Sequence, residues 1–165
     1  MYLQATAEHF LNAFEVLKES NEALIDRLAN SPRNPSAAKA FGADRTWFLV
    51  NGSTCGIIAA ILATCKSNEK IILPRNIHTS AIAGLILSGA MPIFINPEYD
   101  READLAYSVT PEAVENALKQ HPDAKAVILL YPTYQGVCGD VEAIAELSHQ
   151  YNIPLLVDEA HGAHF

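Results

Sequence analysis

The residues best suited to chemistry stand at the end of an apolar run near the carboxyl end of the sequence. Residues 155–157 are Leu-Leu-Val, and Asp158, Glu159 and His161 follow them at once. Such a run is typical of a buried parallel strand, which delivers its ionisable groups to the edge of the sheet. Asp158 is therefore expected to be withdrawn from water, and a buried carboxylate needs a cationic partner. A protonated cofactor ring, a metal ion, a lysine or an arginine would serve; a capping or salt-bridged Asp is the structural alternative.

Two other interpretations of this segment lack supporting residues. Asp-Glu-Ala-His at 158–161 matches the DEAH box of helicases, but the sequence has no upstream glycine-rich loop ending in Gly-Lys-Ser or Gly-Lys-Thr. His161 and His164 have the spacing of zinc ligands, but no third ligand stands at a usual distance from them. The sequence therefore predicts no metal site.

A second group of polar residues is typical of a phosphate-binding turn. Asn51, Gly52, Ser53, Thr54 and Cys55 precede an apolar helical stretch, so free backbone N–H groups and two hydroxyls would face the positive end of a helix dipole. The turn has neither a P-loop lysine nor the glycine spacing of a dinucleotide site. It suits one phosphate monoester, with an ordinary helix N-cap as the alternative.

His78 is the third candidate. It follows a short β-rich run and stands beside Thr79 and Ser80 near the start of a predicted helix. Taken alone, such a histidine is more often a surface or capping residue. In a parallel sheet, however, ligands bind outside the carboxyl ends of the strands, where the phosphate turn and Asp158 are also predicted.

The elements that would position these residues alternate along the chain. Predicted strands and helices succeed one another from residue 46 onward, which indicates right-handed βαβ crossovers. We therefore predict an α/β fold: a three-layer α/β/α arrangement with a mostly parallel sheet. The strands are expected at 46–50, 70–73, 92–95, 126–130 and 154–157, the helices at 57–65, 77–87, 111–119 and 140–150, and an acidic surface excursion at 96–109.

The first part of the chain has a different pattern. Apolar residues recur at alternating steps of four and three between residues 2 and 29, which predicts a helix. This helix either lies on its own domain or pairs with another helix through Asn21. A polar loop containing Pro32 and Pro35 follows. We divide the chain into an N-terminal helix with its linker, residues 1–35, and an α/β part, residues 36–165.

Composition excludes several classes of protein. The chain has 165 residues, a net charge of -8 and no basic cluster, which argues against binding to nucleic acid or an anionic membrane surface. No apolar run approaches the roughly 20 residues of a membrane-spanning helix. The N-terminal residues do not resemble a secretory signal, so a cytoplasmic protein is expected. Cys55, Cys65 and Cys138 are predicted to be reduced.

Taken together, these segments resemble the Orn/Lys/Arg decarboxylase family, enzymes with an aspartate-aminotransferase-like fold that use pyridoxal 5'-phosphate. The resemblance covers the chain from about residue 36 and rests on residues 40–46, 48–54, 75–78, 131–134 with Gly136, and 157–165. It implies that residues 36–165 are part of the large cofactor-binding domain. The implied substrate is a basic amino acid: arginine, lysine or ornithine.

The resemblance also implies roles for individual residues. Ser53, Thr54 and Cys55 would hold the cofactor phosphate, the cysteine through little more than its backbone N–H. The other four residues would surround the ring. His78 would stack on it, Asp158 would pair with its nitrogen and keep it protonated, Ala160 would lie against its face, and His161 would approach its oxygen edge. His78, Asp158 and His161 are the expected catalytic residues.

Two departures from the family shape the expected function. The family's Schiff-base lysine follows the Asp158 motif, and the sequence ends at Phe165 before reaching it, while residues 1–33 do not resemble the family's usual entry segment. We therefore expect a fragment that is inactive alone and, as in many such enzymes, a homo-oligomer. The alternatives are a non-catalytic, self-associating remnant, or an aminotransferase or aldolase of the same fold.

Overall fold

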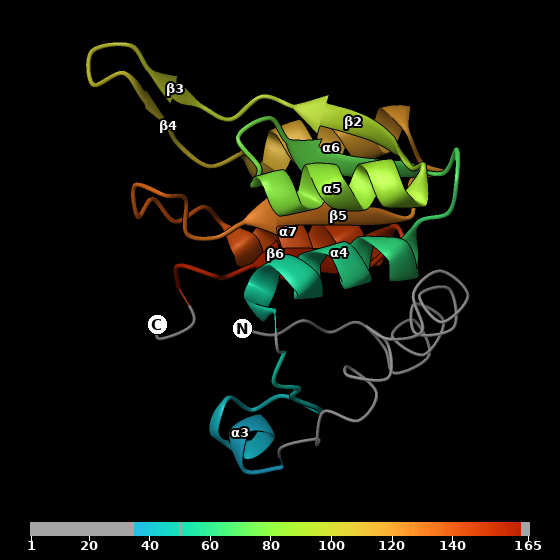
Figure 1. The fold of residues 1–165 in the computed structure, drawn as a ribbon. Coiled ribbons are helices and arrows are strands. Elements are labelled where there is room, and N and C mark those ends of the chain that lie inside the picture. The colour runs from blue at the N-terminus through green and yellow to red at the C-terminus, as the bar shows by residue number, and fades with distance from the viewer. Residues whose placement is uncertain (1–34, 50, 163–165) are drawn as a thin grey trace.

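A four-stranded parallel sheet forms the centre of the computed structural model, which describes residues 35–49 and 51–162 (Figure 1). The strand order is β2–β1–β5–β6, and each neighbouring pair is parallel. The strands are β1 (Lys70–Pro74), β2 (Met91–Ile95), β5 (Ala126–Leu130) and β6 (Leu155–Asp158). This arrangement confirms the predicted α/β fold with a parallel sheet.

Helices cover both faces of the sheet. α4 (Gly52–Thr64) and α5 (Thr79–Ser88) lie on one face, and α6 (Pro111–Gln120) and α7 (Val141–Gln150) lie on the other (Figure 1). Two of these helices begin at capping residues that can be recognised in the sequence. The side chains of Thr110 and Asp140 accept hydrogen bonds from the third residue of α6 and α7, at 3.2 and 3.0 Å.

The alternation of side chains along the strands divides the core into two clusters. Ile71 and Leu73 of β1 pack with α4 and α5, whereas Ile72 between them packs with α6 and α7. Because both faces are covered, the central strand β5 is apolar and buried at every position. In β6, Leu156 belongs to the α4/α5 cluster. Asp158 is two residues further along the same strand and therefore faces the same side.

The order of the strands creates a switch point. The chain runs from β1 outward to β2 and then returns to place β5 on the opposite side of β1. The loops that leave the carboxyl ends of β1 and β5 therefore diverge, one toward α5 and the other toward α7. Open α/β sheets bind ligands at such a divergence.

Some predicted elements differ from the structure. The strand predicted at 46–50 is wrong: residues 46–49 belong to neither of the described sheets, and position 50 lies outside the described residues. Trp47 alone forms an isolated β-bridge, and the run does not extend into a ladder with any of the described strands. α4 begins at Gly52, five residues before the predicted start. The helix predicted at 2–29 lies outside the described residues.

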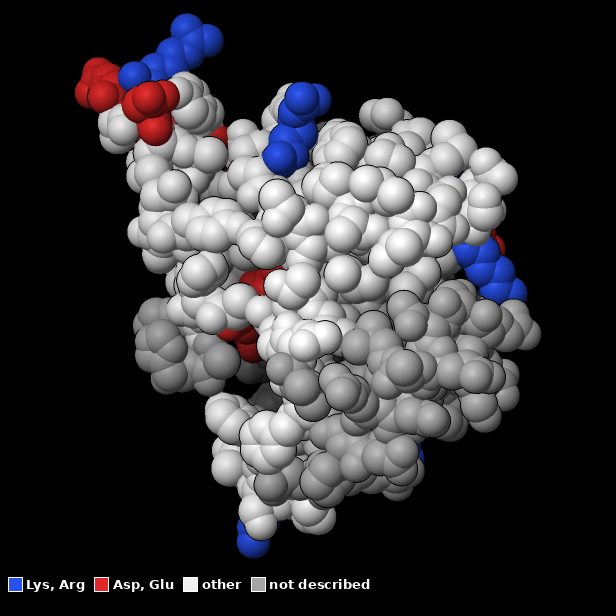
Figure 2. Space-filling view, viewed as in Figure 1, with Lys and Arg blue, Asp and Glu red and all other residues white. Residues whose placement is uncertain are grey.

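Two smaller elements lie apart from the sheet. The predicted surface excursion contains a hairpin of β3 (Tyr99–Asp100) and β4 (Leu105–Ala106), which projects from the body of the molecule (Figure 1). The short helix α3 (Pro35–Ala40) lies below α4 in the same view. On the face seen in Figure 2, the Lys and Arg side chains stand apart from one another. No helix within 35–49 and 51–162 is long and apolar enough to cross a bilayer.

A close contact between α4 and α5 fixes their spacing. A Cβ atom added at Gly84 in α5 would lie 2.8 Å from Cδ1 of the buried Ile61 in α4, closer than real Cβ atoms approach other atoms. The absence of a side chain at Gly84 thus lets the two helices pack together. Since both helices begin at the carboxyl edge of the sheet, this contact also sets the distance between their first turns.

We expect Gly84→Val to lower the free energy of unfolding by about 2 kcal/mol, because the added carbons overpack the contact with Ile61. Ile61→Ala alone should cost roughly 2–5 kcal/mol through the cavity it leaves. In the double variant the cavity accommodates the valine, so the total loss should be smaller than the sum. Urea unfolding of the four proteins measures this coupling, and strict additivity would contradict the proposed contact.

The three cysteines differ in burial, and this difference predicts their reactivity. Cys138 is exposed, while Cys55 and Cys65 are buried. Burial raises the pKa of the Cys65 thiol from 9.0 to about 11, so the folded protein keeps this proton at pH values where the unfolded chain has lost it. Stability should therefore fall as the pH rises from 9.0 to about 11, and less so in Cys65→Ala.

The same burial should protect the two inner thiols from alkylation. Iodoacetamide at mildly alkaline pH is expected to modify Cys138 in the native protein, with Cys55 and Cys65 reacting only after urea is added. Peptide mass spectrometry distinguishes the three sites. Equal labelling of all three in the native protein would contradict the packing of Cys65 between α4 and β1.

Candidate functional site

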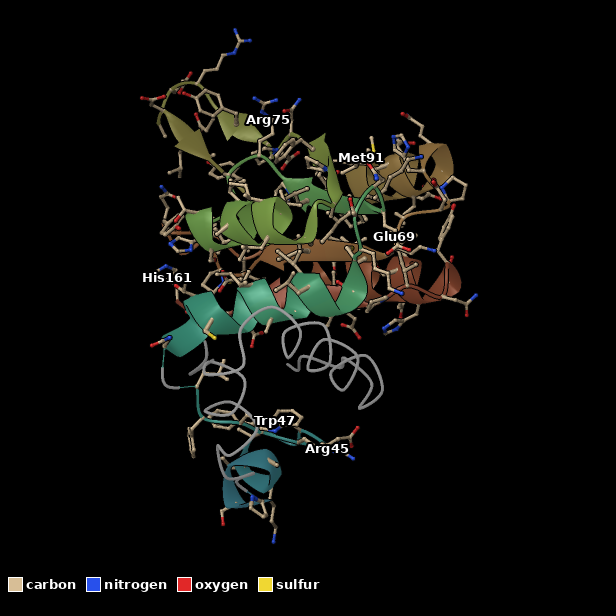
Figure 3. The ribbon with its side chains drawn as sticks, turned by 45° about the vertical axis from the view of Figure 1, so that its right-hand side comes forward. Arg45, Trp47, Glu69, Arg75, Met91 and His161 are labelled. Carbon is tan, nitrogen blue, oxygen red and sulfur yellow. The ribbon has the colours of Figure 1, made fainter. Side chains whose placement is uncertain are left out.

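Four chain segments meet at the carboxyl edge of the sheet: the first turns of α4 and α5, the loop after β5, and the turn after β6. Figure 3 shows His161 at this edge, beside the starts of α4 and α5, with Glu69 and Met91 at the opposite end of the sheet. Acidic side chains are recessed on the same side of the molecule (Figure 2). Three of these four segments contain site residues that were predicted from the sequence; the loop after β5 contains none of them.

Asp158 is the last residue of β6 and is almost completely buried, with 4% of its surface exposed. Its Oδ1 accepts a hydrogen bond of 3.1 Å from the backbone N–H of Ala160. Its own carbonyl accepts one of 3.0 Å from the N–H of Tyr131, which ties the end of β6 to β5. Within the described part of the chain, the carboxylate has no ion pair. A buried carboxylate held by a single N–H still lacks the cation that its charge requires.

The first turn of α4 offers donors for an anion. Asn51 is its N-cap but makes no side-chain cap hydrogen bond, and Ser53 and Thr54 in the first turn are exposed. The backbone N–H groups of these first positions have no acceptor within a helix. Ser53 and Thr54 therefore present two N–H groups and two hydroxyls at the positive end of the helix.

Cys55 is the least suited of the three residues predicted to hold a phosphate. Its thiol is buried, and burial raises its pKa, so the sulfur stays protonated. Because α4 begins at Gly52, the N–H of Cys55 stands at the first position that has an intrahelical acceptor. Because the helix starts earlier than predicted, the N–H groups without an intrahelical acceptor include those of Ser53 and Thr54 but not that of Cys55.

His78 caps α5, which fixes its ring. Its Nδ1 accepts the backbone N–H of Ser80 at 3.2 Å and lies 2.8 Å from the Ser80 hydroxyl. Because Nδ1 accepts a hydrogen bond, the proton of the neutral imidazole stands on Nε2. His78 therefore caps the helix and also lies at the switch point, as both interpretations of the sequence required.

Tyr134 is a site residue that the analysis of the sequence missed. It lies in the loop after β5, and its ring centroid is 6.2 Å from that of His78 and 5.0 Å from that of His161. Burial and the negative charge of Asp158 raise the pKa of the Tyr134 hydroxyl, so this group stays neutral. An available signal was its position in the loop that follows β5 at the switch point.

Ala160 and His161 lie in the turn after β6. Both are exposed, and the backbone of Ala160 holds Asp158 as described above. His161 contacts Tyr134, so the turn is packed against the β5 loop. His164, which has the spacing of a zinc ligand from His161, lies outside the described residues. Within 35–49 and 51–162 no three His, Cys, Asp or Glu side chains gather as metal ligands.

Two other ionisable groups near Asp158 have a raised pKa. Burial raises the pKa of Glu159, the residue next to Asp158. A hydrogen bond with Cys138, together with burial, raises the pKa of Tyr131. These shifts describe surroundings that disfavour additional negative charge, as expected beside a carboxylate that has no cationic partner among the described residues.

The donor set fits pyridoxal 5'-phosphate. The first turn of α4 suits a phosphate, the Asp158 carboxylate suits a protonated ring nitrogen, and His78 offers an aromatic ring at the same edge of the sheet. Asp158 and α4 are also close, because Leu156 of β6 packs in the same cluster as Ile57 and Ile61 of α4. A ligand spanning them must carry an anionic group at one end and a cationic group at the other.

Comparison with known proteins agrees with this fit. Residues 28–165 match the model of the family described as Orn/Lys/Arg decarboxylase, major domain. An arginine decarboxylase of Bacillus subtilis (strain 168) is 48% identical over 128 residues, which make up 78% of this chain and 26% of that protein. The chain thus spans about a quarter of the length of this relative.

Solved structures show the same fold. A constitutive lysine decarboxylase of Escherichia coli aligns with a TM-score of 0.61 at 18% identity, over 74% of this chain and 18% of that chain. N-Succinyldiaminopimelate aminotransferase from Mycobacterium tuberculosis aligns with a TM-score of 0.61 at 20% identity, over 92% of this chain and 41% of that chain. The fold alone does not separate decarboxylases from aminotransferases, but the family match does: the chain belongs to the Orn/Lys/Arg decarboxylase family and corresponds to the N-terminal part of its major domain.

Proposed function

We propose that this chain provides the cofactor-binding part of a pyridoxal-phosphate-dependent decarboxylase that acts on a basic amino acid. The observation that carries the proposal is the buried carboxylate of Asp158, which has no cationic partner among the described residues and faces the same side of the sheet as the first turn of α4. The family match supports decarboxylation over the other chemistries of this fold. The names of the relatives favour arginine as substrate, with lysine and ornithine as the other members of the class.

Each residue has a role that follows from its geometry. Ser53 and Thr54, with a smaller contribution from Cys55, bind the phosphate through the first turn of α4. His78 offers a ring face whose orientation is fixed by its hydrogen bond to Ser80. The bound cofactor supplies an electron sink that stabilises the carbanion left when carbon dioxide departs.

Asp158 has the most demanding role, because it keeps the ring nitrogen protonated. A carboxylate in a low-dielectric site favours the protonated form of a neighbouring base more strongly than one in water does. Ala160 would position this carboxylate through its N–H, and the family resemblance assigns it to a ring face. His161 stands at the exposed edge of the site, beside Tyr134. We further propose a cytoplasmic homo-oligomer, in keeping with the free cysteines and the family.

Asp158→Asn tests the proposal. The change keeps the shape of the side chain but removes the charge, so the affinity for pyridoxal 5'-phosphate should fall roughly 10- to 100-fold, the range expected for a hydrogen bond between charged groups. Equilibrium dialysis or the absorbance of the bound ring gives the affinity. Asp123→Asn is a matched control, because Asp123 pairs with Lys70 at the other end of the sheet.

A cofactor analogue with carbon in place of the ring nitrogen sharpens the test. This analogue has no proton to share with Asp158, so its affinity should be almost the same for the native chain and for Asp158→Asn. Inorganic phosphate should compete with both ligands, because it occupies the first turn of α4. Failure of the native chain to bind pyridoxal 5'-phosphate saturably, or equal losses for both ligands in Asp158→Asn, would overturn the proposed role.

A further inference from the structure

Tyr134 connects two imidazoles that come from distant parts of the chain. His78 begins α5 after β1, and His161 lies in the turn after β6, while Tyr134 follows β5 between these two strands. Its ring is tilted by 51° to that of His78 and by 59° to that of His161, at centroid distances of 6.2 and 5.0 Å. Both are tilted arrangements at distances that aromatic pairs favour.

We propose that Tyr134 is a positioning residue whose ring orients the imidazoles of His78 and His161 for the cofactor. The inference rests on the proposed function, because it assigns the ring a task at the same site. Sheet topology supports it. β5 lies between β1 and β6, so a side chain from its carboxyl end can contact residues from both neighbouring strands at once.

The two histidines differ in how firmly the rest of the protein holds them. The ring of His78 is fixed on one edge by its hydrogen bonds to Ser80. His161 is exposed in a turn. Among the described residues, its ring contacts the ring of Tyr134. Tyr134 therefore transmits the fixed position of His78 to the less constrained His161.

The ring of Tyr134, rather than its hydroxyl, carries this role. Among the described residues the hydroxyl has no hydrogen-bonding partner, and half of the side chain is exposed, at 51%. Burial and the charge of Asp158 also keep the phenol neutral, so it offers no charge to either imidazole. A phenylalanine at this position should therefore preserve the arrangement, whereas an alanine should not.

NMR of the full chain with labelled histidines tests the arrangement without any ligand. We expect Tyr134→Ala to move the ring-proton resonances of both His78 and His161, since the ring current of Tyr134 is lost and His161 is released. Tyr134→Phe should keep both resonances near their native positions. Tyr99→Ala is the matched control, because Tyr99 is similarly exposed, at 55%, but lies in the β3–β4 hairpin.

Binding of pyridoxal 5'-phosphate then tests the functional role. Tyr134→Ala should weaken binding about 2- to 10-fold, the range expected for loss of an aromatic pair, and Tyr134→Phe should restore it. Unchanged histidine resonances in Tyr134→Ala would overturn the proposal. Equal weakening in Tyr134→Phe and Tyr134→Ala would also overturn it, because the hydroxyl would then contact the ligand directly.

The two measurements separate this inference from the proposed function. If the native chain binds no pyridoxal 5'-phosphate, the proposed function fails, while the histidine resonances still decide whether Tyr134 orients the two rings. If the native chain binds the cofactor and Tyr134→Ala binds it equally well, the cofactor site stands and the positioning role of Tyr134 is overturned. Urea unfolding of each variant verifies that the fold is retained.

Discussion

The structure of the site depends on the burial of one negative charge. Asp158 ends a strand whose other three residues are buried, so its carboxylate lies in a low-dielectric region with 4% of its surface exposed. A single N–H from Ala160 offsets only part of the cost of removing a carboxylate from water. Burial also disfavours the charged forms of the neighbouring groups, since it raises the pKa of Glu159 and of Tyr134. The site is therefore electrostatically incomplete until a cation arrives.

Sheet topology brings the other site residues to this charge. The strand order places β2 on one side of β1 and β5 on the other, which brings the loops that carry His78 and Tyr134 beside each other at the carboxyl edge. Close packing of α4 on α5, made possible by Gly84, brings the first turn of α4 to the same edge. The site thus depends on packing far from it, because a change in helix spacing would move the donors of Ser53 and Thr54 relative to Asp158.

Much of this arrangement was predictable from the sequence. The apolar run before Asp158 and the alternation of strands and helices gave the parallel sheet and the edge at which the site lies. The run at 46–49 was predicted as a strand but forms only a single β-bridge at Trp47, because β propensity reports the suitability of a residue for a sheet and not the length of the ladder it joins. Tyr134 was missed for a related reason: a loop tyrosine has no periodicity, and its contacts with His78 and His161 arise only from strand order.

The pairing of opposite charges also explains how an acidic chain can select a phosphorylated ligand. The overall charge of -8 disfavours anions at long range, but this repulsion is screened within about 10 Å at moderate ionic strength. At contact distance the first turn of α4 presents N–H groups to a phosphate, while Asp158 repels a second anion and attracts a protonated ring. Inorganic phosphate can bind only at the first turn of α4, and a nucleotide brings no cationic group to Asp158. Under the proposed function, selectivity for a phosphate joined to a basic ring would follow from placing a helix N-terminus and a buried carboxylate on one face of the sheet.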